Sequence, residues 1–185
     1  EYFAFAPHAQ NTPHLVYTGS MDWLPNEDAV LYFAEHIFQQ IRSRYPQALF
    51  TIVGRRPSDK VRRLGQIAGI HVTGTVDDVR PYYAGATALV VPLRIGGGSR
   101  LKILEAMSAG VPVLSTTIGC EGLDVQDDEH LLIADEPGLF AAKTIKLPSR
   151  QDLQTRLSNN ARLRLQERYR WASMPEGLAA MYDAL

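Results

Sequence analysis

Short apolar runs alternate with longer segments of helical periodicity along most of the chain. The short runs are rich in valine, isoleucine and leucine, and several end at a glycine or a proline, as buried strands commonly do. The runs that predict strands cover residues 14–20, 48–54, 70–74, 88–92, 111–116 and 130–134. Near-continuous apolar strands separated by helices indicate a parallel sheet of about six strands that is covered on both faces.

The longest helical pattern follows the first predicted strand. Its apolar stripe consists of Val30, Phe33, Ile37 and Ile41. Asn26 is the expected N-cap, and Pro46 is expected to end the segment. Further helices are predicted at 58–68, at 77–86, at 99–109 and from residue 149 onward, with a last helix that is broken by Pro175.

This alternation predicts an α/β fold, a Rossmann-like doubly wound parallel sheet followed by C-terminal helices. In such sheets ligands bind outside the carboxyl ends of the strands, where the loops from strand to helix gather. Gly19, Gly54, Gly74 and the run 96–98 all lie just beyond predicted strands. One edge of the sheet is therefore expected to carry the flexible backbone and the binding site.

Composition limits the class of protein. The 185 residues suit one domain, and a formal net charge of −1 gives no support to nucleic-acid binding. No apolar run is long enough to predict a membrane span. The one cysteine, Cys120, excludes an internal disulfide and favours a reducing, cytoplasmic compartment. Because the chain starts at Glu1 and not at a methionine, we expect it to be a piece of a larger protein.

The segment "PLRIGGGSRLKILEAMSAGVPVLST" (92–116) places three glycines before two cations in the first turn of a predicted helix. Cations are unfavourable at the positive end of a helix, by roughly 0.3–1 kcal/mol each. Glycine backbone, a helix N-terminus, Arg100 and Lys102 together suit a phosphate or diphosphate. The alternative is a loop with two solvated cations, in which Lys102 pairs with Glu105. The segment lacks the glycine spacing of a P-loop or of the dinucleotide fingerprint.

Glu105 is surrounded in sequence by the apolar residues of the same helix, one turn beyond the glycine run. A carboxylate in that place can accept hydrogen bonds from the hydroxyls of a ribose or sugar whose phosphates lie at the turn. The alternative is an ordinary glutamate that faces solvent. Spacing alone leaves both open.

The stretch "VPLRIGGGSRLKILEAMSAGVPVLSTTIGCEGL" resembles the C-terminal, donor-binding half of group 1 (family 4) retaining glycosyltransferases of the GT-B fold. Supporting similarity lies in "TGSMDWLPNEDAVLYF", "IVGRRP", "VTGTVDDVRPYYAGATALVVP" and "ERYRWASMPEGLAAMY". The resemblance implies that residues 1–185 bind a nucleotide-diphosphate sugar and that an N-terminal acceptor domain is absent from the chain. It implies a ribose contact for Glu105, and places Thr75 and Val76 near the base. It also implies diphosphate and donor-sugar contacts for the loop of Gly96, Gly97, Gly98 and Ser99.

Two departures from the family pattern matter. The family often has a second glutamate eight positions before the "LEAM" glutamate, and Gly97 stands there. Many members carry an arginine and a lysine after the first strand of this half, but "GSMDWLPN" holds no cation. Arg55, Arg100 and Lys102 remain to bind the diphosphate, with Lys102 and Glu105 as the catalytic candidates. Arg55 is equally compatible with a solvated loop position.

The expected reaction is glycosyl transfer with retention to a glycan or lipid acceptor, which the missing domain would bind. No metal and no further cofactor is expected, and the full protein is expected to be cytoplasmic, with peripheral membrane attachment as an option. The isolated chain is expected to bind donor but to transfer nothing. Two alternatives stay open: a non-catalytic nucleotide-sugar-binding module, and a Rossmann-type oxidoreductase cofactor domain.

Other conspicuous residues have structural interpretations. The five histidines show no ligand spacing, and the pair Asp77–Asp78 is expected to cap a helix. Trp23 and Trp171 are expected to be packing residues and not to stack on a substrate, although the strand-end loop that holds Trp23 leaves stacking open for that residue. Cys120 has no neighbouring base that would make it a nucleophile.

Overall fold

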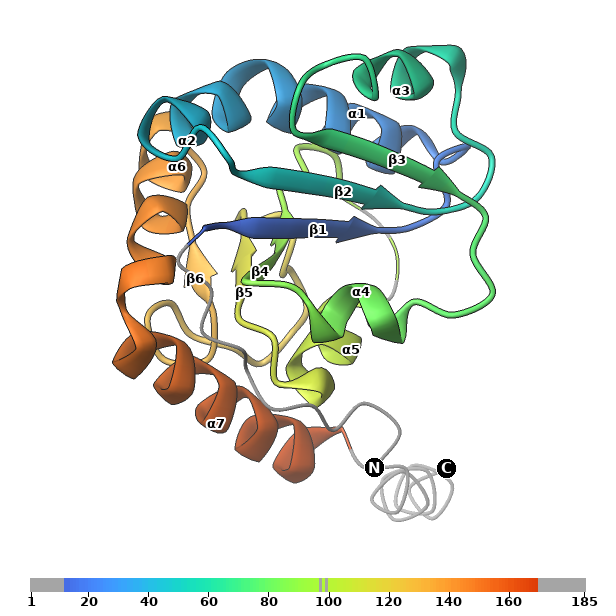
Figure 1. Cartoon of the computed structure of the whole chain (residues 1–185). Coiled ribbons are helices and arrows are strands. Elements are labelled where there is room, and N and C mark those ends of the chain that lie inside the picture. Colours follow the sequence, from blue (N-terminus) through green and yellow to red (C-terminus); the bar gives the residue numbers. More distant parts are fainter. Residues whose placement is uncertain (1–11, 97, 99, 170–185) are drawn as a thin grey trace, which may run out of the picture.

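The computed structural model describes residues 12–96, 98 and 100–169, and its centre is a parallel β-sheet (Figure 1). The strands are β1 (His14–Thr18), β2 (Leu49–Val53), β3 (Ile70–Gly74), β4 (Ala88–Val91), β5 (Val113–Ser115) and β6 (Leu132–Ile133). They form one six-stranded sheet in the order β3-β2-β1-β4-β5-β6. All neighbouring strands are parallel. The fold class and all predicted strands are confirmed, although most strands are a little shorter than their apolar runs.

Burial explains why these runs form strands. Every residue of β4 is buried, and so are four of the five residues in β1. Side chains point alternately to the two faces of a strand, so such strands need helices on both sides. The edge strand β3 is more open, with Ile70 as its one buried residue.

The helices are α1 (Leu24–Tyr32), α2 (Gln39–Arg44), α3 (Asp59–Leu64), α4 (Arg80–Ala84), α5 (Leu101–Ala109), α6 (Pro137–Lys146) and α7 (Gln151–Arg168). A π-helical segment, Phe33–Phe38, joins α1 to α2, so that residues 24–44 form one long helical element. Its predicted apolar stripe is buried. The predicted last helix, with Trp171 and Pro175, lies outside the described residues.

The prediction of Asn26 as the N-cap of the long helix is wrong. The helix begins at Leu24, with Trp23 in the capping position and Pro25 in the first turn. Proline is tolerated there because the first helical N–H groups have no partner inside the helix. The amide of Asn26 instead makes long-range contacts with β1 and α5.

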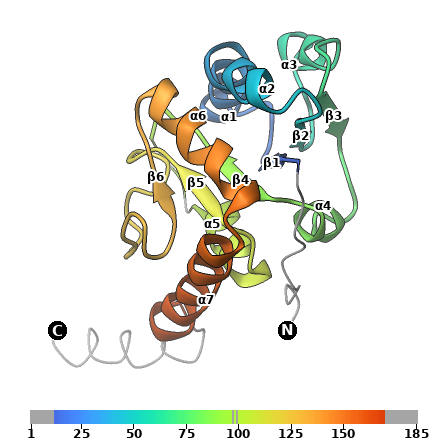
Figure 2. The same cartoon turned by 60° about the vertical axis from the view of Figure 1, so that its left-hand side comes forward.

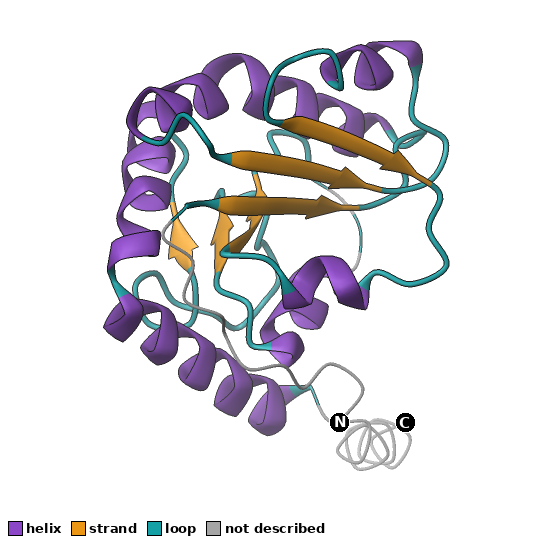
Figure 3. Cartoon of the chain, in the orientation of Figure 1, coloured by secondary structure: helices purple, strands orange, loops and turns teal. Residues whose placement is uncertain are grey.

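Two layers of helices cover the sheet (Figures 2 and 3). One layer contains α1, the π-helical segment, α2, α3 and α6, which contact one another. The other contains α4 and α5, and α7 packs on α5. Phe33 lies at the centre of the first layer, with ring centroids 4.6 Å from Phe50 and 5.8 Å from Phe140. The sheet is therefore doubly wound, as predicted, while α6 had no counterpart in the sequence prediction.

The strand order creates one place where the chain leaves neighbouring strands in opposite directions. β1 and β4 are adjacent in the sheet, but β1 leads to α1 in one layer and β4 leads to α5 in the other. A crevice opens at such a switch point, outside the carboxyl ends of the strands. The fold thus positions a binding site between the N-terminal ends of α1 and α5.

Candidate functional site

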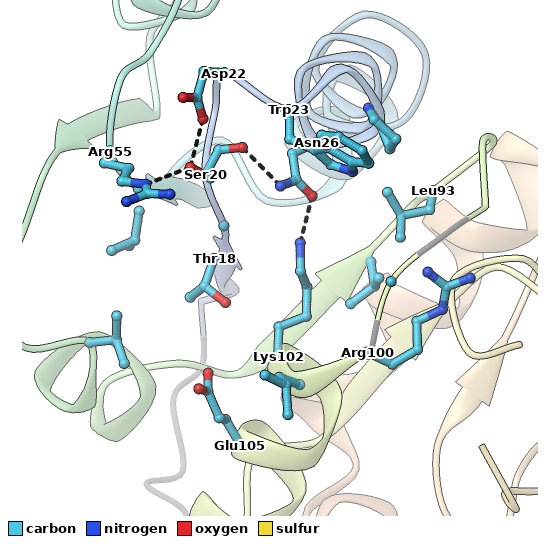
Figure 4. A pocket seen from close by; sticks show the side chains of 18 of the residues that line it. Thr18, Ser20, Asp22, Trp23, Asn26, Arg55, Leu93, Arg100, Lys102 and Glu105 are labelled. Carbon is cyan, nitrogen blue, oxygen red and sulfur yellow. Dashed lines mark hydrogen bonds between the residues drawn. The ribbon is translucent and has the colours of Figure 1, made fainter. Parts of the chain in front are cut away.

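A cleft of about 840 Å³ occupies this switch point (Figure 4). Its walls come from the segments that follow β1, β2, β3 and β4, together with the first turns of α5. The side chains and glycines that carry its polar chemistry are Thr18, Gly19, Ser20, Asp22, Asn26, Arg55, Thr75, Gly98, Arg100, Lys102 and Glu105. Most of the residues predicted from the sequence for donor binding therefore meet in one cavity.

Lys102 lies in the first turn of α5 and extends toward β1 (Figure 4). Its Nζ donates a hydrogen bond of 2.9 Å to Asn26 Oδ1 and lies 3.9 Å from the centroid of the Tyr17 ring. Burial is the main cause that lowers the pKa of Lys102 to about 7, and the positive charge of Arg100 acts in the same direction. The nearby Glu105 carboxylate opposes both effects. A freely solvated cation therefore does not describe Lys102.

Arg100 caps α5 in a left-handed conformation, with φ of 52°. Its side chain is only 6% exposed and lies 3.6 Å from the Glu121 carboxylate. Its Nη2 donates a 2.8 Å hydrogen bond to the carbonyl of Ile118. Because a non-glycine residue in this conformation costs about 1–3 kcal/mol, the surrounding contacts must hold it there. Arg100 lines the cleft and also ties the segment after β5 to the start of α5.

Glu105 is half-buried and faces the cleft from the same helix. Its Oε2 accepts a hydrogen bond of 3.2 Å from the hydroxyl of Tyr83, on α4. Burial raises the pKa of the Glu105 carboxyl, while the Tyr83 hydrogen bond and the charge of Lys102 act against that rise. The alternative of an ordinary solvent-facing glutamate is therefore wrong. The sequence analysis missed Tyr83, whose hydroxyl also lies 3.0 Å from Thr18 Oγ1.

Arg55 is exposed and follows β2. Its Nε donates a 2.8 Å hydrogen bond to Ser20 Oγ, in the loop after β1. Asn26 Nδ2 donates to the carbonyl of the same serine at 2.9 Å. A chain of hydrogen bonds thus runs from Lys102 through Asn26 and Ser20 to Arg55 along one wall of the cleft (Figure 4).

The glycine run is only partly described. Gly98 has φ of 99°, a conformation suited to glycine, and it lines the cleft. Gly96 lies next to Ile118 and Glu121, and it is not among the residues that line the cleft. Gly97 and Ser99 lie outside the described residues. Thr75 and Val76, which were expected near a base, lie on the β3 side of the cleft.

The interpretation of Trp23 as a packing residue is wrong. Its side chain is 58% exposed and lines the cleft. The reason is its capping position before α1, which places it on the loop at the open edge of the sheet. Its location in the loop that follows the strand-end Gly19 was the signal available in the sequence.

The other residues singled out in the sequence are Asp77 and Asp78, the histidines and Cys120. Asp78 Oδ1 accepts the backbone N–H of Arg80 at the start of α4, although the N-cap position of this helix is held by Val79 and not by either aspartate. Within the described ranges, no group of three or more His, Cys, Asp and Glu side chains is placed to hold a metal ion. Burial raises the pKa of the Cys120 thiol, which donates to the Thr116 carbonyl.

Residues 12–150 match the family described as glycosyl transferases group 1. Because this match covers most of the chain, the protein belongs to that family, and the oxidoreductase alternative is wrong. A curated relative is the "uncharacterized 44.6 kDa protein in cps region" of Klebsiella pneumoniae, which is 24% identical over 164 residues. That alignment covers 84% of this chain and 42% of the relative, so the chain spans less than half of the relative's length.

Solved structures agree with the fold. A mutant of S. aureus TarM, in a complex with fondaparinux, α-GlcNAc-glycerol and UDP, superimposes with a TM-score of 0.79 at 18% identity, over 96% of this chain and 37% of TarM. The C-terminal domain of the group 1 glycosyl transferase LpcC from Francisella tularensis superimposes with a TM-score of 0.70 at 19% identity. In that case the match covers 91% of this chain and 96% of the other. The fold is that of one half of a GT-B glycosyltransferase.

Among the helices in the described part of the chain, none combines the length and apolarity needed to cross a membrane.

Proposed function

We propose that residues 1–185 form the donor-binding domain of a retaining glycosyltransferase of family 4, and that the cleft binds a nucleotide-diphosphate sugar. The observation that carries this proposal is the pairing of Lys102 and Glu105 on one turn of α5, at the switch point of the sheet. The ammonium of Lys102 suits a diphosphate, and the carboxylate of Glu105 suits the hydroxyls of a ribose. Membership in the group 1 family and the UDP in the TarM complex support the same chemistry.

In this proposal the diphosphate lies between the N-terminus of α5 and the loop after β1. Lys102, the backbone of Gly98 and Arg55 face that space, with Arg100 at its border. Negative charge develops on the leaving diphosphate during glycosyl transfer, and fixed donors in a cleft stabilise such charge without reorganising. These groups supply the charge without a metal ion. Glu105 accepts from the ribose, and Thr75 and Val76 lie on the side of the base.

The acceptor is proposed to bind to a second, N-terminal domain that the curated relative is long enough to contain. A glycan or lipid acceptor, a cytoplasmic location and peripheral membrane attachment belong to the same proposal. The 185-residue chain is then expected to bind donor without transferring the sugar. A non-catalytic nucleotide-sugar-binding role is the second candidate, because Gly97 stands where the family often has a glutamate. Glycosyl transfer by the full-length protein would support the glycosyltransferase role, and its absence would support the non-catalytic binding role.

Nucleotide binding is the direct test. We expect one of UDP, GDP or ADP to bind the isolated chain more tightly than its nucleoside, with unchanged affinity in the presence of EDTA, because protein groups supply the positive charge. Isothermal titration calorimetry with each diphosphate and each nucleoside measures this. If none of the three diphosphates binds, or if EDTA abolishes binding, the proposed donor site is wrong. Glycosyl transfer by the isolated chain would refute the division of labour between the two domains.

The ribose contact of Glu105 predicts an ordered series of variants. We expect Glu105→Ala to weaken nucleoside diphosphate binding by about 1.5 kcal/mol, the lower range for hydrogen bonds to a charged group. Glu105→Gln keeps the shape and one acceptor oxygen, so it should cost less than Glu105→Ala. Calorimetry with 2′-deoxy and 3′-deoxy nucleotides identifies which ribose hydroxyl donates to Glu105. If the wild-type protein binds the deoxy and parent nucleotides with equal affinity, the proposed contact between Glu105 and the ribose is wrong.

A further inference from the structure

The loop after β1 contains no cation of its own, yet a cation lies against it. Residues 19–26, "GSMDWLPN", hold no lysine or arginine. A Cβ atom added to Gly19 would lie 3.0 Å from Lys102 Nζ and 2.8 Å from Asn26 Nδ2. The Lys102 ammonium therefore reaches the end of β1 from a helix that begins far later in the sequence.

Two side chains hold the ammonium in that place. Asn26 Oδ1 accepts from both Lys102 Nζ, at 2.9 Å, and the Tyr17 hydroxyl, at 2.6 Å. Asn26 Nδ2 donates to the carbonyl of Ser20, so both ends of the amide have a partner. The face of the fully buried Tyr17 ring lies 3.9 Å from the ammonium, within the range of a cation–π contact. The amide orientation and the lysine position thus depend on each other.

We propose that Asn26 and Tyr17 are positioning residues, which hold Lys102 Nζ at the carboxyl end of β1 as the cation that binds the donor diphosphate. This inference rests on the proposed function, since it concerns the same cleft. It goes further in assigning roles to two residues that do not need to touch the donor. It also explains how a site without cations after β1 gains one.

A neutral amide suits this role better than a carboxylate. An aspartate at position 26 would pair with the ammonium and oppose an anion, whereas the asparagine oxygen orients the ammonium and leaves its charge unbalanced. The phenol of Tyr17 also stays neutral, because burial raises its pKa. The lysine is held by two uncharged groups.

The charged groups around Lys102 come from several elements. Arg100 and Glu105 flank it on α5, and Asp22 and Arg55 line the cleft from the loops after β1 and β2. Asp28, on α1, is bound to Arg94. Tyr83, on α4, is a neutral donor to Glu105. Among these, Arg100 lowers the pKa of Lys102 and Glu105 raises it, and burial has the larger effect, which gives the value of about 7.

The lowered pKa of Lys102 makes the binding of a diphosphate depend on pH. A bound diphosphate favours the ammonium and raises its pKa, so binding draws a proton onto Lys102 near neutral pH. Affinity is then highest below pH 7 and falls as the pH rises through 7. Lys102→Arg keeps the charge throughout this range and removes this dependence, leaving only the titration of the nucleotide.

A double-mutant cycle tests the positioning role. The affinity for UDP and for uridine is measured by calorimetry for the wild type, Asn26→Ala, Lys102→Ala and the double variant. Where GDP or ADP is the diphosphate that binds the wild type, it and its nucleoside replace UDP and uridine throughout. We expect Asn26→Ala to weaken UDP binding about tenfold in the wild type and to have almost no further effect in the Lys102→Ala background. Uridine, which has no phosphate, should bind all four alike. Tyr17→Phe, which keeps the ring and loses the hydroxyl, should have a smaller effect in the same direction.

Controls separate positioning from damage to the fold. Asn160→Ala removes an exposed amide that donates to the carbonyl of Glu129, and it should leave UDP affinity unchanged. The uridine measurements show whether Asn26→Ala keeps the rest of the cleft. Profiles of UDP affinity between pH 6 and 8.5 are compared for the wild type and Lys102→Arg, and the wild type should lose affinity more steeply as the pH rises.

Three outcomes would contradict the positioning role of Asn26 and Tyr17 or the proposed function beneath it. If Asn26→Ala costs the same in both backgrounds, or costs nothing in either, the positioning role is wrong while nucleotide binding stands. If the pH profiles of wild type and Lys102→Arg coincide, the ammonium is not held in the buried position and the inference fails. If UDP, GDP and ADP all fail to bind the wild type, the proposed function fails and this inference with it.

Discussion

Replacing Lys102 with alanine is expected to weaken nucleoside diphosphate binding by about 1.5–3 kcal/mol, or roughly 10- to 150-fold. The reason is the position of its ammonium, which lies inside the cleft, where a charge is screened less than at the surface. The loss should be smaller for the nucleoside monophosphate and smallest for the free nucleoside. Calorimetry with the three ligands measures this gradient.

Lys60→Ala is the matched control for this prediction. Lys60 also lies in the first turn of a helix, α3, but its side chain is exposed and does not line the cleft. The variant removes the same charge from the chain, so an effect of net charge alone would appear in both variants. An equal loss for the diphosphate, the monophosphate and the nucleoside in Lys102→Ala would mean that the lysine does not contact the diphosphate.

A single methyl group at Gly54 is expected to lower the free energy of unfolding by about 3 kcal/mol or more. Gly54 follows β2, and a Cβ atom there would overlap the carbonyl oxygen of Gly19 and lie 2.8 Å from its carbonyl carbon. Both atoms are backbone, so the loop after β1 must move. For a chain of this size we expect Gly54→Ala to lower the Tm by roughly 6–12 °C, measured by thermal unfolding.

Gly138→Ala provides the comparison for Gly54→Ala. Gly138 lies in α6, and a Cβ atom there meets nothing within 4 Å. Alanine is the better helix former, so this variant should be neutral or more stable by up to about 1 kcal/mol. A Gly54→Ala protein as stable as the wild type would show that the loops after β1 and β2 do not approach each other as closely as described.

The fold was predictable because local pattern determines most of it. Each strand of the sheet is an apolar run bounded by glycine, proline or polar residues, and the buried stripe of the long helix has a period that the sequence shows directly. Helix α6 escaped prediction although its buried residues, Phe140, Ala141 and Thr144, have helical spacing. It begins at Pro137-Gly138, a pair that is more typical of a turn.

The site was predictable only in part, because its partners are distant in sequence. The position of Lys102 and Glu105 after a glycine run indicated a binding helix. However, Asn26 lies 76 residues before Lys102, and Tyr83 lies 22 residues before Glu105. No local pattern relates such pairs, and the same amide was open to interpretation as a helix cap. Trp23 was misplaced because tryptophan is usually buried, whereas the strand-end loop exposes it.

Helix α5 fixes the distance between the backbone positions of Lys102 and Glu105, because both residues belong to the same rigid helix. Lys102 and Glu105 are three residues apart, about 4.5 Å along the helix axis, and the buried residues Ile103, Ala106 and Met107 clamp the helix against its neighbours. Any rigid movement of α5 displaces Lys102 and Glu105 together. A change in the glycine run that precedes the helix therefore leaves the spacing of the two groups unchanged.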